Sequence, residues 1–161
     1  MPNKKAEIEG VSIAEWRHEM NAGNEAFASG DADIAAAHYW RAVSIAEELV
    51  RLAEQGLIDP GCAMRATLEA RRNLSENYLR LGRIDNAVEA LEINFMQFCL
   101  RAAWPCMPPP VRRACAGKIA ESLSEFVRLL ERTHASTAKI LSVYAIAEEA
   151  QAQSRKLEDA A

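Results

Sequence analysis

The sequence predicts an all-α protein, built as a short array of helical hairpins. Half of its 161 residues are hydrophobic while only 6% are aromatic, and alanine is very common. This composition favours helices that approach one another closely. The few Gly and Pro residues cluster between segments whose apolar residues recur at three-and-four spacing. We therefore predict about six helices in three antiparallel pairs, over roughly 12–56, 59–103 and 110–156.

The length fits one domain with an adequate core. Residues 1–11 are predicted to form a flexible N-terminal tail, and residues 12–158 a single helical domain.

The first hairpin begins at a clear helix-start signal. Ser12-Ile13-Ala14-Glu15 is a capping-box pattern, which predicts a helix from about residue 13. That helix should end near Ser29-Gly30. Either Asp31 or Asp33 can cap the second helix by accepting backbone N–H bonds, and Gly56 is a suitable C-terminal stop.

The second hairpin has similar helix start and stop signals. Asp59-Pro60 predicts the start of a third helix, with Asp as the cap and Pro in the first turn. This helix should end at Gly82. Asp85 is expected to open the fourth helix, which should reach about Ala103.

A proline-rich segment, Trp104–Pro110, separates the second and third hairpins. Its three consecutive prolines favour an extended polyproline conformation. The segment is either a stiff connector with Trp104 packed as an anchor, or a docking strip for a partner. A fifth helix is expected over 111–132 and a sixth over 138–155. This third hairpin is a candidate cap for the end of the array.

Two stretches follow one pattern of small and aromatic residues. The first runs from Gly23 to Asp31 and continues with Ala35, Tyr39 and Ala42. The second has Leu74, Tyr78, Gly82, Ala87 and Leu91 in equivalent places. The pattern resembles the tetratricopeptide repeat, a helix-turn-helix unit of about 34 residues. The two glycine turns lie farther apart than that repeat requires, so we expect lengthened helices.

The resemblance implies a right-handed superhelix whose concave groove holds a peptide or helix of a partner protein. The chain is also similar to small bacterial proteins of this repeat class that have no assigned activity. By similarity, the first helix of each hairpin lines the groove. The predicted groove residues are Arg17, Met20, Asn24, Phe27, Glu69, Arg72, Asn73, Glu76 and Arg80.

Charges alternate along the third helix, at Glu69, Arg72, Glu76 and Arg80. One interpretation is a solvated face with ion pairs along the helix, each worth about 0.2–0.5 kcal/mol. The other is a charged groove that recognises a partner of mixed charge. The sequence leaves both open.

One subclass of tetratricopeptide proteins clamps a C-terminal carboxylate with Lys, Asn and Arg side chains. Asn24 and Asn73 match that pattern, and Lys118 is a further candidate. Met20 and Ser122 stand where cations are expected. Because charge-assisted bonds are the strong part of such a site, an anion would bind weakly here.

Several function classes lack support in the sequence. The net charge of −4 provides no basic field for nucleic acid, and no apolar run is long enough to cross a bilayer. The N-terminus does not resemble a secretory signal, so we expect a cytoplasmic protein with reduced cysteines. The cysteine spacing does not suggest a metal site, and no catalytic or phosphate-loop motif is present. We therefore expect no enzyme activity and no cofactor.

The function predicted from the sequence is protein–protein interaction, as an adaptor or chaperone-like scaffold. A homodimer that associates through an exposed apolar end of the array is the first alternative. A small-molecule-binding helical protein is the second.

Overall fold

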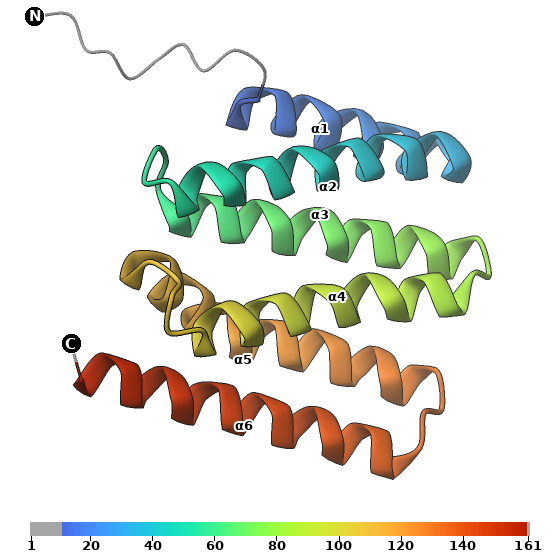
Figure 1. Cartoon of the computed structure of the whole chain (residues 1–161). Coiled ribbons are helices and arrows are strands. Elements are labelled where there is room, and N and C mark those ends of the chain that lie inside the picture. The colour runs from blue at the N-terminus through green and yellow to red at the C-terminus, as the bar shows by residue number, and fades with distance from the viewer. Residues whose placement is uncertain (1–10, 161) are drawn as a thin grey trace, which may run out of the picture.

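A computed structural model describes residues 11–160 of the chain, and within them every regular element is an α-helix. The prediction of an all-α helical array is confirmed. The helices stack in chain order with alternating direction (Figure 1). They are α1 (Ile13–Ser29), α2 (Ala32–Glu54), α3 (Pro60–Arg80), α4 (Ile84–Ala103), α5 (Pro109–Arg132) and α6 (Thr137–Asp159).

The predicted start signals of α1 and α3 are confirmed. Ser12 N donates to Glu15 Oε2 at 2.8 Å and Glu15 N donates to Ser12 Oγ at 3.2 Å, so the capping box is complete. Asp59 Oδ2 accepts a bond of 2.8 Å from the backbone N–H of Cys62. Both side chains satisfy N–H groups that have no partner inside their helix.

Other helix ends differ in detail from the predictions. Asp31 precedes α2, but its side chain caps no backbone N–H and accepts from the Ser29 hydroxyl at 3.2 Å. Asp85 lies inside the first turn of α4, which begins at Ile84. It still suits that place, since a negative charge near a helix N-terminus is favourable. Val11, assigned to the predicted tail, packs half-buried against the core. The rest of that tail lies outside the described residues.

The proline run is not an extended connector. Only Pro108 is extended, with φ −52° and ψ 133°, while Pro109 and Pro110 form the first turn of α5. Proline is tolerated there because the first N–H groups of a helix have no intrahelical acceptor and its fixed φ suits the helix. The fifth helix therefore begins two residues earlier than predicted.

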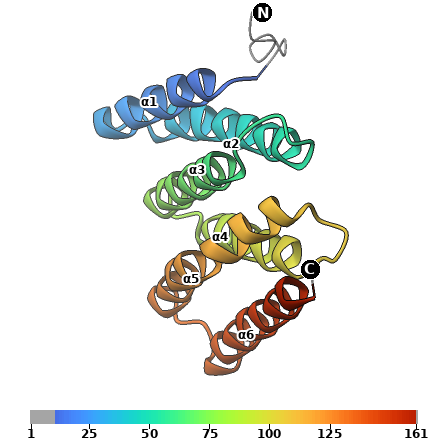
Figure 2. The same ribbon diagram turned by 90° about the vertical axis from the view of Figure 1, so that its left-hand side faces the viewer.

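The sixth helix is longer than predicted. Ser136 Oγ accepts from the backbone N–H of Lys139 at 3.2 Å and caps a helix that continues to Asp159. In Figure 2, α6 lies beneath both α4 and α5 and forms the lower end of the stack. Its buried side chains are few and mostly small: Val143, Ala147, Ala150 and Ser154.

One continuous apolar core runs through the stack. Alanines without exposed surface allow the helices to approach closely; Ala35, Ala42 and Ala46 of α2 are examples. Larger side chains fill the lower half, where the rings of Phe95 and Phe126 lie 5.9 Å apart between α4 and α5. Helix α6 packs against α4 and α5 at the end of this core.

Candidate functional site

The predicted groove residues gather on one face of the stack, formed by the first helices of the hairpins. Arg17, Met20 and Asn24 of α1 lie opposite Glu69, Arg72 and Asn73 of α3, around a depression of about 300 Å³. Met20 is buried, with 6% of its surface exposed. We call this surface the first-helix face.

Most polar side chains on the first-helix face bind each other. Asn73 Nδ2 donates to Asn24 Oδ1 at 3.0 Å, and the Tyr39 hydroxyl donates to the same oxygen at 2.8 Å. These bonds join α1, α2 and α3. The two asparagines that match the carboxylate-clamp pattern are therefore engaged in hydrogen bonds between the helices.

Arg72 is also engaged, with two carboxylates of α5. Its Nε lies 2.6 Å from Glu125 Oε1, and its Nη2 lies 3.1 Å from Glu121 Oε1. Burial raises the pKa of Glu125, whereas the hydrogen bond from Lys118 lowers the pKa of Glu121. Arg72 of the charge stripe thus forms ion pairs with the neighbouring hairpin, a possibility that the sequence interpretation did not include.

The remaining predicted residues near the hairpin turns have intramolecular partners as well. Arg80 Nη1 donates to the carbonyl oxygen of Phe27 at 2.5 Å, and its guanidinium lies 4.7 Å from the centre of the Phe27 ring. Arg80 therefore provides a hydrogen-bond donor for a backbone carbonyl group in the last turn of α1 and places its positive charge near the negative end of the helix dipole. Glu76 Oε2 lies 3.5 Å from Arg132 Nη1. Among residues 11–160, Arg17, Glu69 and Arg80 are the predicted groove charges without an ion pair, and Arg80 is bound to Phe27 instead.

A second surface was anticipated only at Trp104 and Pro105, within the segment considered as a docking strip for a partner. An apolar groove of about 680 Å³ lies between the C-terminal half of α4 and the middle of α6. We call it the α4–α6 groove. Its ten lining residues are Met96, Cys99, Leu100, Ala103, Trp104, Pro105, Ala145, Ile146, Glu149 and Ala150.

Large apolar side chains are exposed at the α4–α6 groove. Leu100 is 62% exposed, Trp104 56% and Ile146 37%. Trp104 is thus not the packed anchor that the sequence interpretation considered, because the chain leaves α4 there in an extended conformation and its indole faces solvent. Large apolar residues that converge at one place on a surface mark an interaction site more often than scattered ones do.

The floor of the α4–α6 groove includes the buried thiol of Cys99. Burial raises the pKa of this thiol to about 11, so it stays protonated at neutral pH and acts as an apolar surface. The thiols of Cys62, Cys99, Cys106 and Cys115 are free. Within the described part of the chain, no cluster of three or more His, Cys, Asp or Glu could hold a metal ion.

The sequence held a weak signal for the α4–α6 groove. Met96, Leu100 and Ala103 follow three-and-four spacing on α4, as do residues packed in the core. Helix α6 has apolar residues on more than one side, since Val143 and Ala147 are buried while Leu141 and Ile146 are exposed. A terminal helix with two apolar sides can bury only one of them against its own array.

The fold and its surfaces define an all-α protein of three stacked helical hairpins with an open apolar groove at its last helix. The chain matches the family described as a protein of unknown function (DUF2753) over residues 14–158, and it belongs to that family. The match includes all six helices almost completely. Neither the curated proteins nor the solved structures gave a match. None of the helices between residues 11 and 160 is both long and apolar enough to span a membrane.

Proposed function

We propose that this protein is a protein–protein interaction module that holds an amphipathic helix of a partner in the α4–α6 groove. The observation that carries the proposal is the groove itself, where Leu100, Trp104 and Ile146 are exposed around an apolar hollow. Helix-in-groove recognition uses this kind of surface. The proposal keeps the adaptor role suggested by the tetratricopeptide resemblance and assigns it to a different surface.

The size of the α4–α6 groove favours a single helix as its occupant. Its wall on α4 extends from Met96 to Ala103, which at 1.5 Å per residue is about 10 Å, or two helical turns. Ten residues line it, whereas a stable interface between two proteins uses about 20–30 residues on each side. The groove is therefore small for a homodimer interface and well matched to one partner helix.

The apolar side chains provide the driving force for such binding. Complete burial of a large apolar side chain contributes about 1.5–3 kcal/mol. Leu100 and Trp104 are more than half-exposed, so covering each would contribute about 1 kcal/mol or more. The walls are held by the protein core, so little ordering of the groove is needed on binding.

The first-helix face is the weaker candidate because its charges already have partners. A ligand that binds Arg72 must compete with Glu121 and Glu125, and a ligand that binds Asn73 must compete with Asn24. In the α4–α6 groove, a partner helix displaces only water. The proposal includes neither a catalytic step nor a cofactor, and a cytoplasmic location remains a prediction.

Charge insertion at the two walls of the α4–α6 groove tests the proposal. The variants Leu100→Glu and Ile146→Glu place a carboxylate on α4 and on α6, at exposed positions where folding should be little affected. The matched control is Leu57→Glu, an equivalent change at a 46% exposed leucine between α2 and α3. Arg17→Glu is the control on the first-helix face, because Arg17 is exposed there and has no ion pair to lose within residues 11–160.

Partners captured from the native host by the wild-type protein are identified, purified and measured for direct binding. We expect both groove variants to lose at least ten-fold in affinity while Leu57→Glu and Arg17→Glu bind normally. Loss with Arg17→Glu alone would contradict the proposal and favour the first-helix face. A stable dimer in light scattering that dissociates with Ile146→Glu would show that the surface serves self-association instead.

A further inference from the structure

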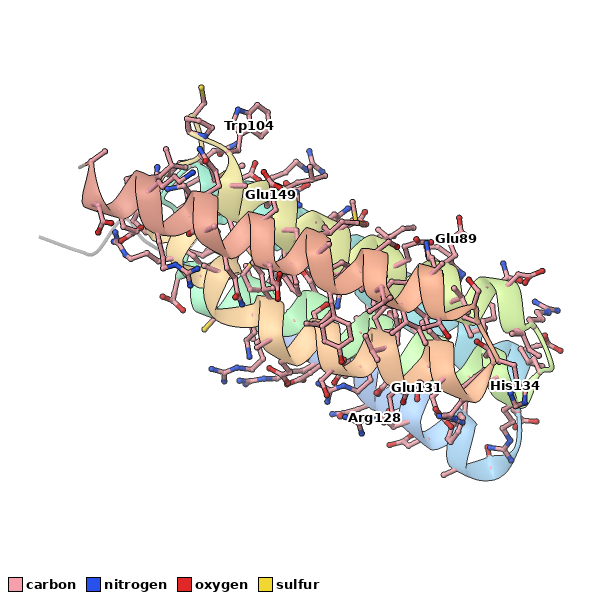
Figure 3. All side chains as sticks on the ribbon, turned by 90° about the horizontal axis from the view of Figure 1, so that it is seen from below. Glu89, Trp104, Arg128, Glu131, His134 and Glu149 are labelled. Atoms are coloured by element: carbon pink, nitrogen blue, oxygen red, sulfur yellow. The ribbon has the colours of Figure 1, made fainter. Side chains whose placement is uncertain are left out.

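The lining of the α4–α6 groove carries one charge, and it is negative. Glu149 is the only charged residue among the ten that line it. Farther along α4, Glu89 is exposed on the same helical stripe as Met96 and Leu100. Within residues 11–160, neither Glu89 nor Glu149 takes part in an ion pair. Figure 3 shows Trp104, Glu149 and Glu89 along one edge of α6, with Arg128 and Glu131 along the other.

The basic side chain at the end of the groove opposite Trp104 already has a partner. Lys139 Nζ, at the start of α6, lies 2.5 Å from Glu92 Oε1 of α4. This pair closes the groove at the end opposite Trp104, and its two charges cancel. Among the residues that line the groove, the unpaired charge is therefore negative, and the exposed Lys156, two turns beyond Glu149 on α6, lies outside the lining.

From this arrangement we infer that the α4–α6 groove selects a basic amphipathic helix, with Lys or Arg on the flanks of its apolar stripe. The inference rests on the proposed function, since it names the chemistry of the helix that occupies the groove. Apolar residues at i, i+3 or i+4, and i+7 would fill the two turns between Met96 and Ala103. Lys or Arg beside that stripe would lie over Glu149.

The physical reason is the cost of a wrong charge at the groove. An acidic helix would place a carboxylate beside Glu149 at the edge of an apolar surface that excludes water, and juxtaposed like charges disfavour the complex. A Lys or Arg on the flank of the helix would instead be attracted to the Glu149 carboxylate. The Trp104 indole, 56% exposed at the end of the groove, adds a surface on which an Arg or Lys can stack.

A displayed library of helical peptides tests the inference before any natural partner is identified. The library fixes apolar residues at i, i+3, i+4 and i+7 and randomises the flanking positions among Lys, Arg, Glu, Asp and Gln. Peptides retained by the wild-type protein and not by Ile146→Glu are sequenced. The same library is then selected against Glu149→Lys and against Glu131→Lys, an equal charge change on α5, beside the opposite edge of α6.

We expect groove-dependent peptides to be enriched in Lys and Arg, and a selected peptide to bind about two- to five-fold more tightly than its version with Gln at the flanks. With Glu149→Lys the enrichment should shift towards Glu and Asp, whereas with Glu131→Lys it should stay basic. The preference should diminish when ionic strength is raised, because exposed charges are screened by salt.

The outcomes separate the two proposals. Groove-dependent peptides without a basic preference, or with one that Glu149→Lys leaves unchanged, would overturn the charge selection and leave helix binding intact. If every retained peptide binds Ile146→Glu equally well, or if none is retained, the groove is not a helix-binding site and both proposals fail.

Discussion

Gly23→Ala should destabilise the protein although it removes a glycine from the middle of a helix. A Cβ atom at residue 23 would lie 2.6 Å from Cε1 and 2.8 Å from Cδ1 of the Tyr39 ring. Ordinary carbon contacts begin at about 3.4 Å, so the ring or the helix must move by roughly 0.8 Å. Tyr39 is 2% exposed and its hydroxyl donates to Asn24, so the ring has little freedom to move.

Three terms give the magnitude of this change. Overpacking a well-packed site costs about 1–3 kcal/mol, and a weakened Tyr39–Asn24 hydrogen bond costs about 1 kcal/mol. Alanine in place of glycine inside a helix returns about 0.8–1 kcal/mol. We therefore expect the free energy of unfolding to fall by about 1–3 kcal/mol, which can be measured by urea denaturation followed by circular dichroism.

The matched control is Gly117→Ala, in α5. A Cβ atom there meets no heavy atom within 4 Å, so only the helix propensity changes. This variant should be more stable than the wild type by about 0.5–1 kcal/mol. If Gly23→Ala proves as stable as Gly117→Ala, the close packing of α1 on Tyr39 is not as described and the reasoning is refuted.

Three further predictions address other parts of the structure. Trp40→Phe should cost about 1 kcal/mol, because it removes the indole donor that lies 2.6 Å from the Tyr78 hydroxyl; equal stability in urea denaturation would argue against that bond. In a carboxyl NMR titration, Glu125 should have a higher pKa than an ordinary glutamate and Glu121 a lower one, and the reverse order would contradict the description of the Arg72 contacts. With its pKa raised, Glu125 should make stability fall as pH rises through its titration, whereas Glu121, with its pKa lowered, should make stability fall as pH drops through its own. Iodoacetamide at pH 8 should label the two exposed cysteines well before Cys99, whose pKa is about 11 and whose thiol is buried; mass spectrometry showing early labelling of Cys99 would indicate that the floor of the groove is open.

Helix boundaries were the part of the fold that local sequence could predict. A capping box at Ser12 and an Asp-Pro pair at 59–60 specify helix starts through hydrogen bonds within four residues, so no distant information is needed. Gly30 and Gly82, with φ of 94° and 70°, mark turns for the same local reason. The proline run was misjudged because prolines at the first two positions of a helix and prolines in a connector look alike in sequence.

The candidate site depends on information that local patterns do not contain. Arg72 pairs with Glu121, 49 residues away, rather than with the glutamates on its own helix. The stacking of α3 on α5 decides that choice. Likewise, Leu100 and Ile146 are spaced like core residues, and only the position of α6 at the end of the array shows that they remain uncovered. The sequence thus indicated interaction in general, whereas the surface proposed here comes from the three-dimensional arrangement.

NMR mapping of a bound helix tests the central claim most directly. A groove-dependent peptide from the library is added to isotope-labelled protein. The account predicts that the side-chain signals of Leu100, Trp104 and Ile146 shift with a common dissociation constant, while the side-chain amides of Asn24 and Asn73 on the first-helix face stay unchanged. Shifts confined to Asn24 and Asn73 would contradict the account and place the partner on the first-helix face.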